Sequence, residues 1–344
     1  TTINKPSEYF NTKLYTGTGA SNAITGVGFQ PDFVWLKRRD STASHALFDI
    51  NRSVNKQLRT NTTGAEETVS WLSSFDADGF TVSTTENDGN ASGGTYASWN
   101  WKANGSGVSN TDGSIASTVS ANTTSGFSIV TYTGTASNAT VGHGLGAKPA
   151  MIIAKNLTTN GEDWVVYHKS LGGYQYYLKL NNTSSVLTNT NRWNAEPDTS
   201  VFNVGAVGET NGSGTSQVAY VFVEKKGYSK FGSYTGNGNA DGTFVYTGFK
   251  PAFVIQKHYS GAATEGWQMW DVKRNPSNLT DLNLMANASG AEFTAAARAI
   301  DILSNGFKCR GADNSGNASG QGYIYMAFAE NPLVGTNGVP ATAR

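Results

Sequence analysis

Short runs of apolar residues alternate with polar turns along the whole chain. FSIVTYTG, AMIIAKN, DWVVYH, YYLKLNN, SVFNVG and VAYVFVE are rich in Val, Ile, Tyr and Phe. Asn-Gly, Asp-Gly and Gly-Gly pairs separate such runs, which is typical of strands joined by tight turns. Several runs are partly alternating, as expected for an antiparallel sheet with one buried face. The pattern predicts an all-β protein.

One stretch departs from this pattern. Residues 291–300, AEFTAAARAI, have a helix-like composition and predict a helix of about ten residues. The longest apolar runs have about six residues, as in Val218 to Val223, whereas a membrane-spanning helix needs roughly 20. We therefore expect no membrane insertion.

Six sequence landmarks recur in the same order three times, so the chain contains three copies of one repeat. Each unit has a Tyr-Thr-Gly, a Pro followed six residues later by Lys, an aromatic followed by a polar residue, a Leu-x-x-Asn, an Asn-x-Ser-Gly, and an aromatic eight residues after that Gly. The landmarks begin at Tyr15, Tyr132 and Tyr234; at Pro31, Pro149 and Pro251; at Phe48, Tyr167 and Trp270; at Leu58, Leu178 and Leu284; at Asn90, Asn211 and Asn317; and at Trp101, Phe222 and Phe328.

The spacing of the landmarks defines the domains. The first two Pro landmarks are 118 residues apart and the last two are 102 apart. The excess lies in a stretch rich in Gly, Ser, Thr and Asn that is typical of a linker. We predict a first repeat at 1–104, a linker at 105–124, a second repeat at 125–228, and a third repeat with a C-terminal tail at 229–344. The linker would let the first repeat move, while the second and third abut rigidly.

About seven or eight strands in roughly 100 residues predict a two-sheet sandwich for each repeat. The fold expected is thus three tandem antiparallel β-sandwich repeats of jelly-roll or lectin-like type. The segment that carries the last landmark is the most apolar of each repeat, so we expect it to be central in its sheet.

Composition excludes several classes of function. The 25 Lys and Arg balance the 25 Asp and Glu, and charged residues are only 15% of the chain. A nucleic-acid binder neutralises phosphates with an excess of positive charge, so we expect no nucleic-acid partner. The single cysteine, Cys309, excludes an internal disulfide and a cysteine-cluster metal site, and it fits assembly in a reducing cytoplasm.

Two segments have the residues of a ligand site without its full pattern. Residues 142–147, GHGLGA, match a dinucleotide fingerprint, but a strand rather than a helix is predicted to follow, so they indicate a turn. The Asn-rich loops at 86–90 and 313–317 offer oxygen atoms to Ca²⁺ but lack the spacing of an EF-hand loop. Turn formation explains both loops, and we expect no cofactor and no metal.

Candidate catalytic groups are not shared among the repeats. The four histidines fall at different places relative to the landmarks, except that His168 replaces Asp49 and Asp271. Two carboxylates suffice for a glycosidase, and Asp76 with Asp78 is such a pair, but DADGF is typical of a hairpin turn. We therefore expect no enzyme and no catalytic residues.

Tryptophans beside polar loops are the candidate contacts for a ligand, because an aromatic ring stacks on the apolar face of a sugar. Trp71, Trp193 and Trp267 are the candidates. Trp193 has no counterpart in the other repeats and is the best of them. Trp270 aligns with Phe48 and Tyr167, so core packing is its expected role.

Long strings of the sequence are similar to a family of marine, cyanophage-like bacteriophage virion proteins of structural or tail-fibre type. ITGVGFQPDFVWLKRRD, SFDADGFTV and SWNWKA resemble the first repeat of that group, and GSIASTVSANTTSGFSIVTYTGTASNATVGHGLGAKPAMIIAKN resembles the second. FGSYTGNGNADGTFVYTGFKPAFVIQK, YIYMAFAENP and the terminal PATAR resemble the third. The repeat of this group is a domain of unknown function, so no site residues follow from the resemblance.

The resemblance implies a virion component made in the host cytoplasm, either a tail fibre that contacts a host-surface glycan or receptor, or a capsid or tail decoration protein with a purely structural role. Its partners would be other virion proteins and further copies of itself. A homotrimer is the common fibre arrangement, and because no coiled-coil heptads are present, any oligomer would use the sandwich faces or edges.

Overall fold

The structure is a computed structural model that describes residues 3–262, 264–333 and 342. The protein is all-β, and every pairing between its strands is antiparallel, as the apolar pattern predicts. The helical elements of the described residues are one short α-helix, α1 (Gly208–Asn211), and three single turns of 3₁₀-helix. None of these helices is long and apolar enough to span a membrane.

The first lobe consists of a large and a small sheet. The order in the large sheet is β1-β9-β3-β4, and in the small sheet β2-β8-β7. A bridge between Leu47 and Leu58 connects the large sheet to the hairpin β5-β6. The strands are β1 (Phe10–Thr16), β2 (Asn22–Thr25), β3 (Phe33–Arg38), β4 (Ala46–Asp49), β5 (Lys56–Gln57), β6 (Glu67–Thr68), β7 (Leu72–Asp76), β8 (Gly79–Val82) and β9 (Thr95–Trp101).

The second lobe has a larger main sheet of order β10-β11-β12-β19-β14-β15-β16-β17 and a small sheet β13-β18. Its strands are β10 (Val108–Asn110), β11 (Ser117–Asn122), β12 (Phe127–Thr133), β13 (Ala139–Gly142), β14 (Met151–Asn156), β15 (Val165–His168), β16 (Tyr176–Lys179), β17 (Leu187–Thr188), β18 (Val201–Val204) and β19 (Ser216–Phe222).

The third lobe repeats the arrangement of the first. Its large sheet has the order β20-β28-β22-β23-β24-β25, and its small sheet has the order β21-β27-β26. The strands are β20 (Ser229–Thr235), β21 (Phe244–Tyr246), β22 (Phe249–His258), β23 (Gln268–Asp271), β24 (Leu282–Met285), β25 (Phe293–Thr294), β26 (Ile300–Leu303), β27 (Gly306–Cys309) and β28 (Gly322–Pro332).

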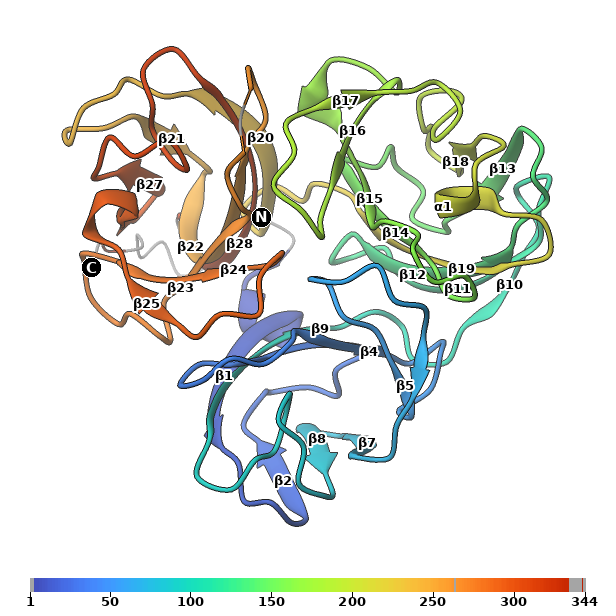
Figure 1. Cartoon of the computed structure of the whole chain (residues 1–344), viewed down its shortest axis with the longest axis horizontal. Helices are drawn as coiled ribbons and strands as arrows, with labels where there is room; N and C mark the ends of the chain where they lie inside the picture. The colour runs from blue at the N-terminus through green and yellow to red at the C-terminus, as the bar shows by residue number, and fades with distance from the viewer. Residues whose placement is uncertain (1–2, 263, 334–341, 343–344) are drawn as a thin grey trace.

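The three lobes surround a common centre, with the large sheets inside and the small sheets at the periphery (Figure 1). The strands that carry the last sequence landmark are β9, β19 and β28, and each lies between two neighbours in its sheet, as predicted. The first landmark strand of each lobe pairs along its full length with the last landmark strand: β1 with β9, β12 with β19, and β20 with β28.

Each lobe contains its own apolar cluster between its two sheets, and a further cluster joins all three lobes. The landmark aromatics Trp101, Phe222 and Phe328 are buried in this shared cluster. The ring of Phe328 has its centroid 5.6 Å from that of Trp101 and 6.1 Å from that of Phe222. Each large sheet therefore has one face toward its own small sheet, and its other face packs against the other two large sheets at the centre of the molecule.

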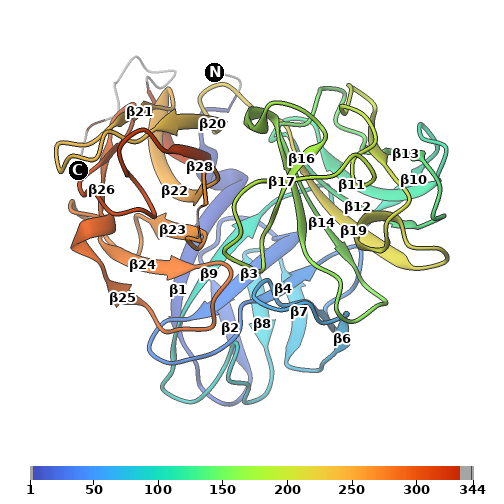
Figure 2. The same ribbon diagram turned by 45° about the horizontal axis from the view of Figure 1, so that its top comes forward.

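The predicted linker is part of the second lobe. Residues 105–124 contain β10 and β11, and β11 pairs with β12 from Ser117 to Asn122. The tilted view in Figure 2 shows both strands beside β12 in that lobe. Ser117, Thr118 and Ser120 lie in strand β11, and composition alone cannot distinguish such a strand from a linker. The shared cluster also contradicts independent movement of the first repeat.

The predicted helix at 291–300 is wrong as well. This segment holds β25, a 3₁₀ turn at Ala296–Arg298 and the first residue of β26. Thr280 bridges Ile300, so tertiary pairing overrides the helix propensity of the alanines. The predicted C-terminal tail lies mostly outside the described residues.

Replacement of Trp101 tests the shared cluster. Trp101→Ala should lower the free energy of unfolding by about 3–5 kcal/mol, because it removes a large buried side chain. Amide hydrogen exchange should accelerate in β19 and β28 as well as in β9, since the three strands share one cluster. The exposed Val108→Ala is the control, with a change within about 0.5 kcal/mol. Faster exchange in the first lobe alone would contradict a common core.

Candidate functional site

The three tryptophans predicted to contact a ligand lie in the interior. Trp71, Trp193 and Trp267 are each at most 3% exposed. The indole N–H of Trp71 donates to Gln57 Oε1 at 2.9 Å, and the Trp193 ring packs beside Phe202 in the cluster of the second lobe. No surface ligand can stack on these rings, so the prediction is wrong. Neighbouring polar residues in a sequence do not show which way a ring points.

Trp267 instead joins two lobes. Its indole N–H donates to the carbonyl of Lys179 in the second lobe at 2.9 Å. At the matching position of the second lobe, Trp164 donates to the carbonyl of Arg59 in the first lobe, also at 2.9 Å. In the first lobe the position is His45, whose Nε2 lies 3.0 Å from the carbonyl of Met285 in the third lobe. Each lobe therefore bonds to the preceding one, and the ring closes.

A second set of hydrogen bonds joins the same three pairs of lobes, here with the donor in the preceding lobe of each pair. The backbone N–H of Glu66 donates to the carbonyl of Leu157 at 2.9 Å. Matching bonds run from Val186 to Tyr259 at 2.9 Å and from Glu292 to Arg39 at 2.8 Å. The Asn of the Leu-x-x-Asn landmark supports this joint, because Asn61, Asn181 and Asn287 accept the backbone N–H of residues 45, 164 and 267.

Buried ion pairs lie at two of the three joints. Arg52 Nε donates to Asp49 Oδ2 at 2.5 Å, and its Nη1 lies 3.1 Å from Glu66. The hydroxyl of Tyr220, from the second lobe, donates to the same Asp49 oxygen at 2.7 Å. Because every charge has a partner, the cost of burying this group is offset locally.

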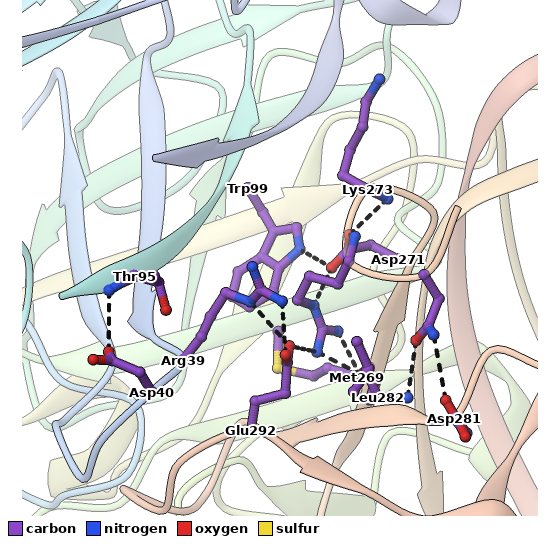
Figure 3. Close-up of polar contacts among 12 residues, drawn as sticks. Arg39, Asp40, Thr95, Trp99, Met269, Asp271, Lys273, Asp281, Leu282 and Glu292 are labelled. Carbon is purple, nitrogen blue, oxygen red and sulfur yellow. Dashed lines mark hydrogen bonds and ion pairs between the residues drawn. The ribbon is translucent and has the colours of Figure 1, made fainter. Parts of the chain in front are cut away.

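The joint between the first and third lobes repeats this arrangement (Figure 3). Arg274 pairs with Asp271 at 2.5 Å and with Glu292 at 3.0 Å. The indole N–H of Trp99 donates to Asp271 at 3.1 Å, as Tyr220 does to Asp49. Arg39 of the first lobe also pairs with Glu292, at 2.7 Å. These groups are fully engaged with one another and hold lobes together.

Among the described residues, the joint between the second and third lobes lacks this buried Asp-Arg-Glu group, and its ion pairs, from Glu224 to Lys169 and to Lys230, are partly exposed. The positions of Asp49, Arg52 and Glu66 are taken there by His168, Leu171 and Val186. His168 Nε2 lies 3.2 Å from the carbonyl of Tyr325, and burial lowers the pKa of this histidine to about 4, so the ring is neutral at pH 7. The chain therefore contains both a charged and an uncharged solution for one joint.

The comparison of the charged joint with the uncharged one predicts how much stability is lost when the ion pair of Asp49 and Arg52 is broken. Arg52→Leu alone should lower the free energy of unfolding by about 3–5 kcal/mol, because it leaves Asp49 buried without its cation. The triple change Asp49→His, Arg52→Leu and Glu66→Val, which copies the second lobe, should recover most of the loss. Urea unfolding of both variants measures the difference. Equal stability of the two would contradict this account.

The landmark lysines are buried at the joints. Lys37, Lys155 and Lys257 are fully buried, and each Nζ donates to the carbonyl of the following residue at 2.7–2.8 Å. Lys37 and Lys257 also donate across a joint, to Ser289 and Thr183. No carboxylate of the described residues forms an ion pair with the three ammonium groups. Burial lowers the pKa of each lysine to about 8.

These lysines predict a pH dependence of stability. An unfolded lysine titrates near pH 10.4, so between about pH 8 and pH 10 the unfolded chain binds more protons than the folded one, and stability rises with pH. Relative to Lys155→Met, the wild type should gain about 1 kcal/mol from pH 8 to pH 9. Buried tyrosines and Cys309 contribute equally to both proteins and cancel. The exposed Lys226→Met is the control variant, and a flat difference for Lys155→Met would contradict the prediction.

The acidic pair and the Asn-rich loops of the sequence have structural partners. Asp76 accepts the hydroxyl of Thr81, and Asp78 accepts the backbone N–H groups of Gly26 and Gly28, which lower its pKa. Asn90 Oδ1 accepts the N–H of Thr18, and Asn211 and Asn317 make the matching bonds in the other lobes. Among the described residues no three His, Cys, Asp or Glu side chains are grouped to hold a metal ion.

The segment that matches a dinucleotide fingerprint, residues 142–147, is followed by strand β14, as predicted.

One outer surface, in contrast, exposes aromatic side chains. On β21 of the third lobe, Phe244 is 44% exposed and Tyr246 is 56% exposed, while Val245 between them is buried. The two rings therefore share the outer face of the small sheet β21-β27-β26. A third exposed apolar residue, Leu279, follows Asn278, whose side chain bonds to Ile302 at the far edge of this sheet.

Charged side chains share this face with the rings. Phe307 and Cys309 of β27 point into the core, so Lys308 between them points outward. Lys308 Nζ lies 2.5 Å from Asp241, and Arg310 lies 3.3 Å from Asp301. The hydrogen bond from Lys308 lowers the pKa of Asp241 and keeps it ionised. We define the β21 face as Phe244, Tyr246, Lys308, Arg310, Asp241 and Asp301.

The other lobes lack an aromatic pair at this place. Val245 pairs with Phe307, as Ile24 pairs with Phe80 and Val141 with Phe202. The outward neighbours are Ala23 and Thr25 in the first lobe, and Thr140 and Gly142 in the second. Sequence reasoning missed the β21 face because it considered only tryptophans as candidate ligand contacts. The Phe-Val-Tyr alternation, present in one repeat only, is the signal that could have found it.

The fold and this face define an antiparallel all-β protein in which the joint chemistry is buried and a distinct aromatic surface is exposed. Residues 5–332 match the model of a family described as a domain of unknown function, DUF7483, and the chain belongs to this family. Comparison with curated proteins and with solved structures found no match.

Proposed function

We propose that the protein is a non-catalytic structural component of a bacteriophage virion, an appendage of tail-fibre type that contacts the host surface. The observation that carries this proposal is the exposed pair Phe244 and Tyr246 on a lobe that is fixed to two others. Exposed aromatic rings on a rigid scaffold are the usual means of contact with a surface ligand. The similarity of long strings of the sequence to marine phage virion proteins supports the same assignment.

The arrangement of sheets supports a mechanical role. We interpret the three lobes as three antiparallel β-sandwich repeats, each a large and a small sheet around its own cluster. A net charge of zero suits an external protein in sea water, because salt there screens the interaction between exposed charges beyond roughly a few Å. Stability there depends on the shared apolar cluster and on buried ion pairs, which salt screens weakly.

The use of the titratable groups supports a non-catalytic role. Asp49, Asp271 and His168 hold the joints between lobes, and Asp78 holds a hairpin. Burial lowers the pKa of His45 and His143, which keeps both rings neutral at pH 7. A general acid or base needs to reach a substrate, and all of these groups except the exposed Asp78 are buried in the protein interior.

A second candidate is a decoration protein that binds only other virion proteins. The observation in its favour is β10, which is the edge strand of the largest sheet and carries Val108 at 66% exposure. An open edge can accept a strand from another protein. In this case Val108, and not the β21 face, would lie in the contact.

Labelling of intact virions tests the proposal. An antibody against the purified chain should label phage particles at the tail or its appendages in the electron microscope. The purified chain should also bind cells of the phage's host and reduce phage adsorption. Labelling of the capsid without any binding to cells would favour the decoration role. Absence of label from the particles would reject both roles.

A further inference from the structure

We propose that the β21 face binds a neutral pyranose unit of a host-surface glycan, with Phe244 and Tyr246 as the stacking platform. This inference rests on the proposed function and names its ligand. A pyranose has an apolar face of C–H groups and a rim of hydroxyls, so it needs flat rings surrounded by hydrogen-bonding groups. The β21 face offers both kinds of group on one sheet.

The two rings are held against the sheet by glycines. A Cβ atom at Gly306, opposite Tyr246 in the sheet, would lie 3.2 Å from Cε2 of Phe244, so the Phe244 ring lies over this glycine. A Cβ at Gly248 would lie 3.6 Å from Cε1 of Tyr246. Residues two apart on a strand are roughly 7 Å apart, which places the rings side by side on one face. Rings that rest on backbone lose little conformational freedom when a ligand binds.

The charges on the face indicate a neutral ligand. Two cations, Lys308 and Arg310, stand beside two carboxylates, Asp241 and Asp301, and the four form ion pairs with one another. The face therefore has no net charge to attract a sulfated or uronic acid polymer. Carboxylates accept hydrogen bonds from sugar hydroxyls, and ammonium and guanidinium groups donate to them, so the pairs suit neutral hydroxyls.

The same charges argue against contact with a second copy of the chain. The cores of protein interfaces are depleted in charged residues, whereas four charged side chains adjoin these two rings. The first lobe provides an internal comparison. Its matching residues, Ala23 and Thr25, are exposed but offer no ring, so one molecule should carry one such site.

The test uses the whole chain with neutral and acidic polysaccharides. The neutral probes are dextran, mannan and agarose, and dextran sulfate and alginate are the acidic ones, with affinity electrophoresis as the measurement. We expect retardation by at least one neutral probe that is little changed between 50 and 500 mM NaCl. Phe244→Ser with Tyr246→Ser should weaken this binding by about tenfold or more, equivalent to the loss of roughly 1.4 kcal/mol.

Two controls isolate the face. Phe293→Ser removes another exposed aromatic, on β25, and should leave binding unchanged. Lys308→Met with Asp241→Asn keeps the rings and removes the ion pairs of Asp241 with Lys308 and Arg310, and it should weaken binding less than loss of the rings does. The melting temperature of each variant verifies that the fold is intact.

The outcomes separate this inference from the proposed function. Binding only to the acidic probes, with loss at high salt, would overturn the neutral ligand. Binding to no polysaccharide, or a change in oligomeric mass of the ring variant, would overturn the glycan site. If the ring variant binds host cells as the wild type does, the inference fails while the proposed function stands. Failure of the wild type to bind cells or label virions is instead failure of the proposed function.

Discussion

Each large sheet of this protein is apolar on both faces, and a sheet of that kind cannot lie exposed in water. Strand β19 illustrates the constraint, because Val218, Tyr220 and Phe222 belong to the shared central cluster while Ala219, Val221 and Val223 belong to the cluster of their own lobe. The small sheet covers one face, and the other face needs a second apolar partner. Three such faces, brought together around one centre, cover one another. The burial of apolar surface therefore requires the lobes to associate, and no lobe can leave without exposing its central face.

The joints determine how the three faces meet. Each lobe presents a donor, His45, Trp164 or Trp267, to a carbonyl of the preceding lobe, so the contacts are head to tail and close after three. One chain thus forms three lobes around one shared apolar cluster. Any association between copies must use outer surfaces, such as the edge strand β10. The polar chemistry of the joints varies between lobes, because a closed and apolar ring keeps its form with either ion pairs or a neutral histidine.

The distribution of polar groups separates structure from function. Buried carboxylates, lysines and histidines bond to the protein itself; the lysines recur at matched positions in all three lobes, and the Asp-Arg pair recurs in two. A position that contacts an external ligand has no requirement to match. The Phe-Val-Tyr of β21 departs from its counterparts Ala-Ile-Thr and Thr-Val-Gly at the outward positions alone, and Val245 keeps the inward one. An exposed position that differs between the repeats is thus a better indication of a ligand contact than a buried group that is shared by them.

The sequence by itself determined the all-β class, the antiparallel pairing and the central place of the last landmark strand, because these follow from local apolar patterns and turns. It also placed Trp270 correctly in a core. Only the tertiary structure decided that residues 105–124 are strands, that 291–300 is not a helix, and that Trp71, Trp193 and Trp267 are buried. It alone revealed the shared cluster and the β21 face. The direction of a side chain depends on which strand lies beside it, and that neighbour is usually distant in the sequence. Tyr220 meets Asp49 across 171 positions, a contact that no local pattern contains.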